Sequence, residues 1–171
     1  MGSTGHKKLV FLVFHREALL YDITNYAFVQ GDVMKTKDEH ERHQVIDIGE
    51  EGNVDRITRV LNLAYQECVD MLYAYTKADM APISSLDNTF GEPQMYKMRL
   101  LVPVTFAKGT VALLKNLIHE YLVCRVLEDW ISITYPEALA VWHEKVESVM
   151  EKITECMNAR SGRVRRSLTP F

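Results

Sequence analysis

The clearest periodic pattern in this chain lies in residues 110–158, TVALLKNLIHEYLVCRVLEDWISITYPEALAVWHEKVESVMEKITECMN. In its first half, apolar side chains recur on one helical face, with two more beside it: Val111, Leu114, Ile118, Tyr121 and Leu122, flanked by Leu117 and Cys124. In its second half they recur in steps of three and four residues: Leu139, Trp142, Val146, Val149 and Ile153. This spacing predicts two long amphipathic helices, with Tyr121 and Trp142 as core anchors.

A proline marks the start of the second helix. The two patterns are separated by SITYP, residues 132–136. Because Pro136 has no N–H and its φ angle is already helical, it fits the first turn of a helix, where that donor would have no partner. Glu137 adds negative charge at the positive end of the helix dipole. We therefore expect a helical hairpin against which the other segments pack.

Composition indicates a single domain over residues 1–171. The chain is 47% hydrophobic and 25% charged, and a chain of this length buries roughly two-thirds of its extended surface on folding. The cysteines Cys68, Cys124 and Cys156 are far apart and odd in number, which predicts buried, reduced thiols. No stretch approaches about 18 consecutive apolar residues, so no membrane span is expected.

Charge is unevenly distributed along the chain. The formal net charge is −3, but residues 159–171 contain four arginines and no acid: Arg160, Arg163, Arg165 and Arg166. Residues 1–158 hold 16 basic and 23 acidic residues, a formal charge of −7. An acidic body therefore carries a basic C-terminal arm. That arm has three alternative interpretations: a disordered end, a nucleic-acid contact, or docking on an acidic neighbouring subunit.

The N-terminal part of the chain predicts an extended segment followed by helices. Residues Lys7 to Phe14 (KKLVFLVF) are rich in β-branched and aromatic side chains, and form either a strand or an arm on a hydrophobic groove. The next helical face is expected to end at Gly31. Its apolar residues are Leu19, Leu20, Ile23, Tyr26 and Ala27. The charged segment 35–44 predicts a short exposed helix that ends near Gly49.

A long helix and an irregular link follow. Asn53 is the expected N-cap of a helix that ends near Thr76. Its apolar stripe comprises Val54, Ile57, Leu61, Ala64, Tyr65, Cys68, Leu72 and Tyr75. Residues 77–93 form an irregular link, and a link of this length is usually functional or ordered by a partner. Residues 95–106 are predicted to be extended, and Pro103 restricts them to an edge strand or a hairpin.

Together these patterns predict a mainly α fold. We expect a small helical bundle with a long C-terminal helical hairpin, a minor extended or β element, and extended arms at both ends. In this division residues 1–14 are an N-terminal arm or strand, residues 15–158 are the helical body, and residues 159–171 are the basic C-terminal arm.

Candidate chemical groups are few. His40 and His43, three residues apart among acidic residues, have a spacing that could suit a metal, but a metal site usually needs a third and a fourth ligand at defined spacing, so a solvated charged helix is favoured over a metal site. His119 and His143 are expected to be packing or surface residues. Cysteines within apolar stripes behave as small hydrophobes rather than nucleophiles. No glycine-rich phosphate loop is present. We therefore expect no catalytic, cofactor-binding or metal-binding residue.

The order of the predicted elements resembles that of a known family. A helix over residues 53–76 precedes a proline-containing link, the segment LLKNLIHEYL (113–122) and a turn. Residues 136–138, PEA, then open a final helix that leads to the arginine-rich arm. Over about residues 53–166 this order resembles the head–tail connector, or adaptor, proteins of tailed bacteriophages, including the Mu-like neck proteins. The resemblance implies a helical bundle that assembles as a ring beneath the portal, with extended termini that clasp neighbours.

The expected function is that of a non-enzymatic virion protein, a connector subunit that docks portal and tail proteins in the phage neck after synthesis in the bacterial host cytoplasm. The expected partner-binding residues are Arg160, Arg163, Arg165, Arg166 and Phe171. A nucleic-acid-binding accessory protein that uses the arginine-rich arm is the alternative, and a metal-dependent enzyme using His40 and His43 is less favoured. Under the connector interpretation, contact with DNA is secondary. No membrane partner, cofactor or small-molecule substrate is expected.

Overall fold

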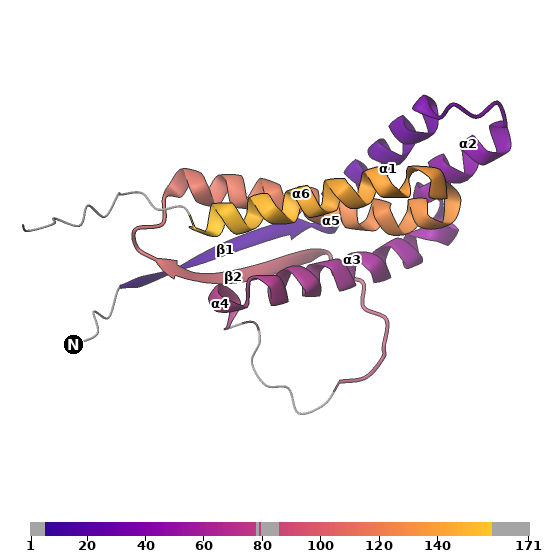
Figure 1. Cartoon of the computed structure of the whole chain (residues 1–171). Coiled ribbons are helices and arrows are strands. Elements are labelled where there is room, and N and C mark those ends of the chain that lie inside the picture. The colour runs from indigo at the N-terminus through magenta and orange to yellow at the C-terminus, as the bar shows by residue number, and fades with distance from the viewer. Residues whose placement is uncertain (1–5, 78, 80–85, 159–171) are drawn as a thin grey trace, which may run out of the picture.

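The computed structural model describes residues 6–77, 79 and 86–158, and shows a mainly helical fold with a small antiparallel sheet (Figure 1). Its elements are, in chain order, β1 (Lys7–His15), α1 (Arg16–Val33), α2 (Glu39–Ile46), the 3₁₀ helix η1 (Asp47–Gly49), α3 (Glu51–Met71), α4 (Tyr73–Thr76), β2 (Met95–Pro103), α5 (Lys108–Thr134), the 3₁₀ helix η2 (Pro136–Ala138) and α6 (Leu139–Asn158). The predicted fold class is thus confirmed, and the C-terminal helical hairpin lies where it was expected.

Helix α5 is the central helix of the bundle. It contacts α1, α3 and α6, and α6 runs alongside it (Figure 1). In its middle turns the buried side chains point in every direction: Tyr121, Leu122, Val123, Cys124, Val126 and Leu127. Trp142 on α6 is also buried, so both predicted core anchors are confirmed. Pro136 begins η2, which leads directly into α6, as its predicted place in a first helical turn requires.

The two strands form one sheet whose inner side is part of the core. Pairing runs antiparallel from Lys7 opposite Pro103 to His15 opposite Met95, so residues 7–14 are a strand rather than an arm. The strands are joined through α1–α4, and β2 therefore belongs to no hairpin. Alternate side chains are buried on the inner side: Leu12, Phe14, Tyr96, Met98, Leu100 and Val102.

Polar groups cover the outer edge of β2. The Tyr65 hydroxyl donates to the Lys97 carbonyl, and the Asp79 carboxylate accepts a hydrogen bond from the Arg99 backbone N–H at 2.7 Å. These side chains occupy backbone groups that a third strand would need, so the sheet ends at β2 on that side.

Two predicted helix boundaries are wrong, and each has a local cause. Gly31 does not end α1, which continues to Val33; instead a Cβ there would lie 2.5 Å from Ile46 Cγ1 on α2. This glycine marks a close approach between helices rather than a stop. Asn53 is not the N-cap of α3, which begins at Glu51. Its amide donates to the Asp47 carbonyl at 2.8 Å, and so ties η1 to the helix.

The helix expected to continue to Thr76 is interrupted at Leu72, where α3 ends and the short α4 begins, while the other segments agree with the predicted pattern. The charged region contains α2, which is capped by Asp38, whose carboxylate accepts from the His40 backbone N–H at 2.9 Å. The Trp130 indole donates to the Val45 carbonyl at 2.9 Å and fixes α2 to α5. The link residues that the structure describes, 77, 79 and 86–94, are irregular.

Candidate interaction surfaces

The outward side of the sheet carries large apolar side chains that the described part of the chain leaves uncovered. We call it the sheet face, and it comprises Lys7, Leu9, Phe11, Val13, His15, Met95, Lys97, Arg99, Leu101 and Pro103. Phe11 is 62% exposed, and Leu9 and Leu101, which lie opposite each other across the strands, are 48% and 40% exposed. A sheet with one solvated side normally alternates apolar and polar residues. The sheet face is therefore typical of a binding surface.

The charges on the sheet face are all positive. Neither β1 nor β2 contains an acidic residue. Lys7 and Lys97 are exposed on this face, whereas Arg99 pairs with Asp79, its Nε lying 2.5 Å from Oδ1. The sheet face therefore combines an apolar centre with exposed ammonium groups that pair with no carboxylate in the described part of the chain.

The outward side of α1 is the second uncovered surface. We call it the α1 face, and it comprises Glu17, Ala18, Tyr21, Asn25, Phe28, Val29, Asp32 and Val33. Tyr21 is 72% exposed and Phe28 is 56% exposed, and seven residues of helical rotation place them on the same side. The opposite side of α1 is buried in the core through Leu19 and Ile23. This helix is therefore apolar on both its buried and its exposed side.

The α1 face is acidic. Glu17 and Asp32 are exposed on it, and the only basic residue of α1 is Arg16. The Arg16 guanidinium is directed away, because it donates to the Thr58 hydroxyl at 3.2 Å and lies 3.5 Å from the Glu92 carboxylate. The α1 face and the sheet face thus combine exposed apolar residues with opposite charge.

A polar cluster holds the inner side of α1 on the hairpin. The Glu120 carboxylate on α5 accepts from the Tyr26 hydroxyl at 2.9 Å and lies 2.9 Å from the Lys145 ammonium on α6. Burial acts to raise the pKa of Glu120, but the hydrogen bonds from Lys145 and Tyr26 outweigh it and hold that pKa below its ordinary value. The Trp142 indole also donates to the Gln30 amide oxygen at 3.1 Å. These contacts set which side of α1 faces solvent.

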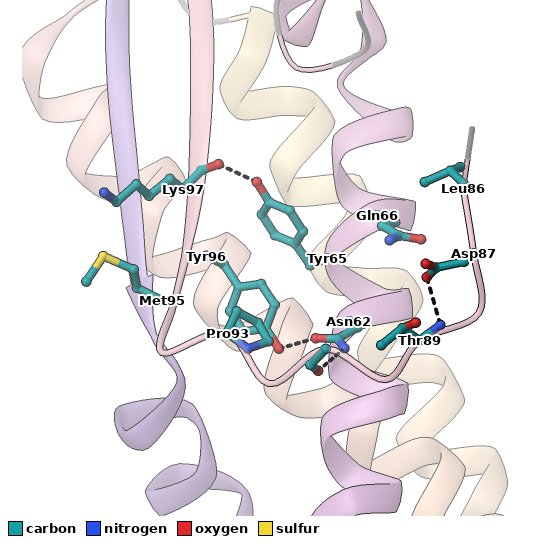
Figure 2. Close-up of a pocket in the computed structure, with 11 residues that line it drawn as sticks. Asn62, Tyr65, Gln66, Leu86, Asp87, Thr89, Pro93, Met95, Tyr96 and Lys97 are labelled. Atoms are coloured by element: carbon teal, nitrogen blue, oxygen red, sulfur yellow. Dashed lines mark hydrogen bonds between the residues drawn. The ribbon is translucent and has the colours of Figure 1, made fainter. Parts of the chain in front are cut away.

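An open pocket lies between α3, the link and β2 (Figure 2). Its volume is about 720 Å³, and Asn62 crosses it, donating to the Gly91 carbonyl at 2.9 Å and accepting from the Tyr96 hydroxyl at 2.6 Å. Burial raises the pKa of Tyr65 and Tyr96 to about 12, so both hydroxyls stay protonated donors. The Asn62 amide and the two tyrosine hydroxyls are already hydrogen-bonded within the chain. These groups therefore hold the link against α3 rather than bind a ligand.

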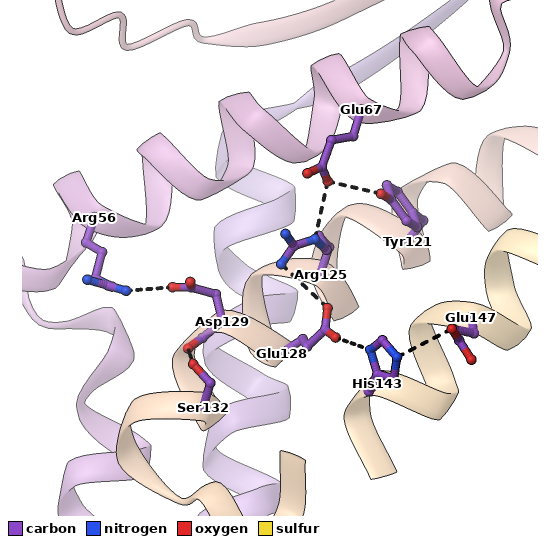
Figure 3. Close-up of polar contacts among 9 residues, drawn as sticks. All are labelled: Arg56, Glu67, Tyr121, Arg125, Glu128, Asp129, Ser132, His143 and Glu147. Carbon is purple, nitrogen blue, oxygen red and sulfur yellow. Dashed lines mark hydrogen bonds and ion pairs between the residues drawn. The ribbon is translucent and has the colours of Figure 1, made fainter. Parts of the chain in front are cut away.

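A chain of charged residues joins α3, α5 and α6 (Figure 3). Arg125 lies 3.2 Å from Glu67 and 3.5 Å from Glu128, while His143 lies 2.5 Å from Glu128 and 3.4 Å from Glu147. The hydrogen bond to Glu128, with the charges of Glu128 and Glu147, raises the pKa of His143 above its ordinary value of 6.5. Glu67 and Glu128 each have Arg125 as a cationic neighbour, and Glu147 contacts a histidine. Partly exposed ion pairs between arginine and a carboxylate contribute about 0–1 kcal/mol each to stability.

The cysteines are buried, as predicted. Burial raises the pKa of Cys68 to about 12 and is the main cause of a rise to about 12 at Cys124. It also raises the pKa of Cys156 above its ordinary value. Thiols of this kind are poor nucleophiles at neutral pH.

The histidines considered above lie on three helices: His40 and His43 on α2, His119 on α5 and His143 on α6. His40 Nε2 is 3.1 Å from the Gln44 amide nitrogen, and His119 Nε2 is 2.6 Å from the Asp22 carboxylate. Among residues 6–77, 79 and 86–158, no group of three or more His, Cys, Asp or Glu side chains is arranged to hold a metal ion.

The predicted partner-binding residues lie outside the described residues: Arg160, Arg163, Arg165, Arg166 and Phe171. Their role stays a prediction. The two uncovered faces, by contrast, do not follow from one apolar stripe per element. Two features of the sequence indicate them: apolar residues such as Tyr21 and Phe28 lie off the predicted stripe, and the run KKLVFLVF is apolar at odd and even positions alike after its two lysines.

Comparison with known proteins identifies no relative. No protein-family model matches the chain, and neither a curated protein nor a solved structure matches it. Within the part of the chain that the structure describes, no helix is long and apolar enough to cross a membrane. Function is therefore argued from the chain's own surfaces.

Proposed function

We propose that this chain is a structural subunit that acts by assembling with other protein chains rather than by catalysis, and that it serves as a head–tail connector subunit of a tailed bacteriophage. One observation carries the assembly part. Large apolar side chains are exposed on two separate faces, with Phe11 62% exposed on one and Tyr21 72% exposed on the other. Contiguous exposed apolar patches on soluble proteins mark interaction sites.

Helix α1 supports the same proposal. A helix that is apolar all round is normally buried on all sides, and α5 follows that rule within the monomer. Helix α1 has apolar side chains on both sides but is covered on only one. A partner on the α1 face would complete its burial.

The connector assignment rests on the order of elements over about residues 53–166. A long helix, a proline-containing link, a second long helix, a turn and a final helix that leads to the arginine-rich arm follow one another in an order that resembles connector subunits. Ring subunits need a rigid body and ends that bind neighbours. The α5-centred core provides such a body, and the +4 arm, opposite in charge to the −7 remainder, is the proposed clasp on a neighbouring subunit, portal or tail protein.

The proposed mode of action is docking rather than chemistry. Support comes from how the titratable groups are engaged: the Cys68 thiol is buried with a pKa raised to about 12, and the Glu120 and Glu128 carboxylates are paired with cations. Such groups stabilise contacts between helices and are unsuited to nucleophilic attack.

Light scattering of the purified chain at low and high salt, with the ultraviolet absorbance ratio recorded, tests the proposal. We expect a large multiple of 19.7 kDa, or a monomer that assembles when portal or tail proteins are added. A monomer that ignores those partners and carries nucleic acid only at low salt would contradict the proposal and support the nucleic-acid-binding alternative.

Deleting residues 159–171 tests the clasp separately. The core residues named above all precede residue 159, so we expect an unchanged helical circular dichroism spectrum and a lower fraction of assembled protein. Assembly at the wild-type level without these residues would refute the clasp while leaving self-assembly through the other faces intact.

A further inference from the structure

We propose that the α1 face and the sheet face are the two halves of one interface, so that the α1 face of one copy docks on the sheet face of the next copy. This inference rests on the proposed assembly function and specifies its contact. It names a second copy of this chain as the occupant of both surfaces.

Charge complementarity identifies the occupant. The α1 face carries Glu17 and Asp32 and no exposed cation, whereas the sheet face carries Lys7 and Lys97 and no acid. Docking one on the other brings opposite charges together around two apolar centres. Opposite potentials across an interface favour the correct partner and speed association.

The same charges disfavour contacts between two like faces. Two sheet faces placed together would oppose ammonium groups, and two α1 faces would oppose carboxylates, and like charges at an interface are costly. An α1 face can meet a sheet face either reciprocally in a two-fold dimer or in a head-to-tail series, and the expected mass, a large multiple of 19.7 kDa, selects the head-to-tail series. A head-to-tail contact uses different surfaces on the two partners, and repeating it gives a closed ring or an open filament.

The dimensions of the two faces agree. An 18-residue helix such as α1 is about 27 Å long, and nine-residue strands such as β1 and β2 are about 30 Å long. The apolar side chains can therefore meet along the whole contact, with Tyr21 and Phe28 on one side and Leu9, Phe11 and Leu101 on the other.

A chain does not cover its own sheet face with α1. The inner side of α1 is fixed to the hairpin through Tyr26, Glu120 and Lys145 and through the bond between Gln30 and Trp142. Both faces are exposed in the same molecule, so each is accessible to the complementary face of another copy.

Charge reversal followed by mixing tests the interface. Variant A carries Glu17→Lys and Asp32→Lys, which leaves two positive faces. Variant B carries Lys7→Glu and Lys97→Glu, which leaves two negative faces. We expect each variant alone to lose assembly, with association weakened at least roughly tenfold. An equimolar mixture should assemble again, because every α1 face then meets a sheet face of opposite charge.

Matched controls place the same charge changes elsewhere on the molecule. Glu151→Lys with Glu155→Lys on α6 matches variant A, and Lys115→Glu on α5 with Lys152→Glu on α6 matches variant B; all four residues are exposed. These control proteins should assemble like the wild type. Thermal unfolding of each monomer establishes that variants A and B are folded.

The outcomes separate the interface from the function. If variants A and B assemble like the wild type, the interface is wrong while the assembly function stands. If each fails alone and the mixture also fails, head-to-tail pairing of these faces is refuted. If the wild-type chain remains a monomer with and without portal or tail proteins, the proposed function fails and the interface fails with it.

Discussion

Helices α5 and α1 are both apolar around most of their circumference, yet they differ in what surrounds them. Helix α5 is covered by α1, α3 and α6, and its middle turns are buried on every side. Helix α1 is covered on one side only, and Tyr21 and Phe28 remain exposed on the other. Apolar residues thus have two uses in this chain: in α5 they build the core, and in α1 they also build a surface.

The difference shows why single-chain stability and assembly can be changed separately. A substitution on α5 removes contacts that exist in every folded monomer. A substitution on the α1 face removes contacts that form only when a partner binds. Effects on monomer stability should therefore be largest in the core of α5, smaller on the covered side of α1 and smallest at the surface of α6.

Truncating the core of α5 should have the largest effect. Leu122 is fully buried, so Leu122→Ala should lower the free energy of unfolding by about 2–5 kcal/mol. Phe28→Ala on the α1 face should change it by less than about 0.5 kcal/mol in the dissociated monomer. Urea denaturation under dissociating conditions measures both values. Equal losses for the two variants would contradict the claim that the α1 face is uncovered in the monomer.

Adding one methyl group to the covered side of α1 should have the next largest effect. In Gly31→Ala the new Cβ would meet Ile46 Cγ1 at 2.5 Å and the Arg42 carbonyl oxygen at 3.3 Å. We expect this overpacking to cost about 1–3 kcal/mol. The control is Gly52→Ala in α3, where nothing lies within 4 Å and a small gain below about 1 kcal/mol is expected. A neutral Gly31→Ala would mean that α2 moves away freely from α1.

The helical hairpin and Gly31 show what sequence patterns can predict and what they cannot. The hairpin could be predicted because residues such as Val146 and Val149 repeat at the helical period, and a core makes that period visible. Gly31 was misread because a glycine that ends a helix and one that admits a neighbouring helix look alike in sequence. The distinction depends on Ile46, which tertiary packing brings close.

The candidate faces could be predicted only in part for a related reason. The charge pattern of α1 and the apolar run of β1 are visible in the sequence, but exposure is a property of the folded chain. Phe11 and Phe14 belong to the same short run, yet one is 62% exposed and the other is 2% exposed. The pairing of β1 with β2, across more than eighty residues of chain between Phe11 and Arg99, decides which is which.

Removing Lys145 should have a moderate effect, because it weakens the junction between α1 and the hairpin. In Lys145→Met, Glu120 loses its ammonium partner, and Tyr26 and Trp142 lose a cation near their rings. The two charged side chains are 41% and 30% exposed, so solvent screening limits the expected loss to about 1 kcal/mol at neutral pH. Lys152→Met, at an exposed position of the same helix, is the control and should be nearly neutral.

The pH dependence of this loss has a definite sign. In the folded protein the pKa of Glu120 lies below its ordinary value. Its pairing therefore stabilises the fold fully at pH values above the ordinary pKa, and this stabilisation decreases as the pH falls. The difference in unfolding free energy between wild type and Lys145→Met should therefore shrink on acidification. A difference that stays constant from about pH 7 to about pH 3 would contradict this account of the cluster.

The smallest effect is expected at His143, which joins α6 to α5 on the surface. Its pKa is raised above the ordinary 6.5 by the hydrogen bond to Glu128, so the pairing stabilises the fold fully below 6.5 and is lost as the pH rises through the higher folded pKa. His143→Gln should therefore lower the melting temperature slightly at about pH 6 and not at about pH 9. His40→Gln, where the imidazole contacts Gln44 instead of a carboxylate, is the control and should leave the melting temperature unchanged at about pH 6. His143 is 59% exposed, and buried apolar residues already hold the hairpin together. A large destabilisation in His143→Gln would therefore mean that α6 depends on surface ion pairs more than on the core of α5.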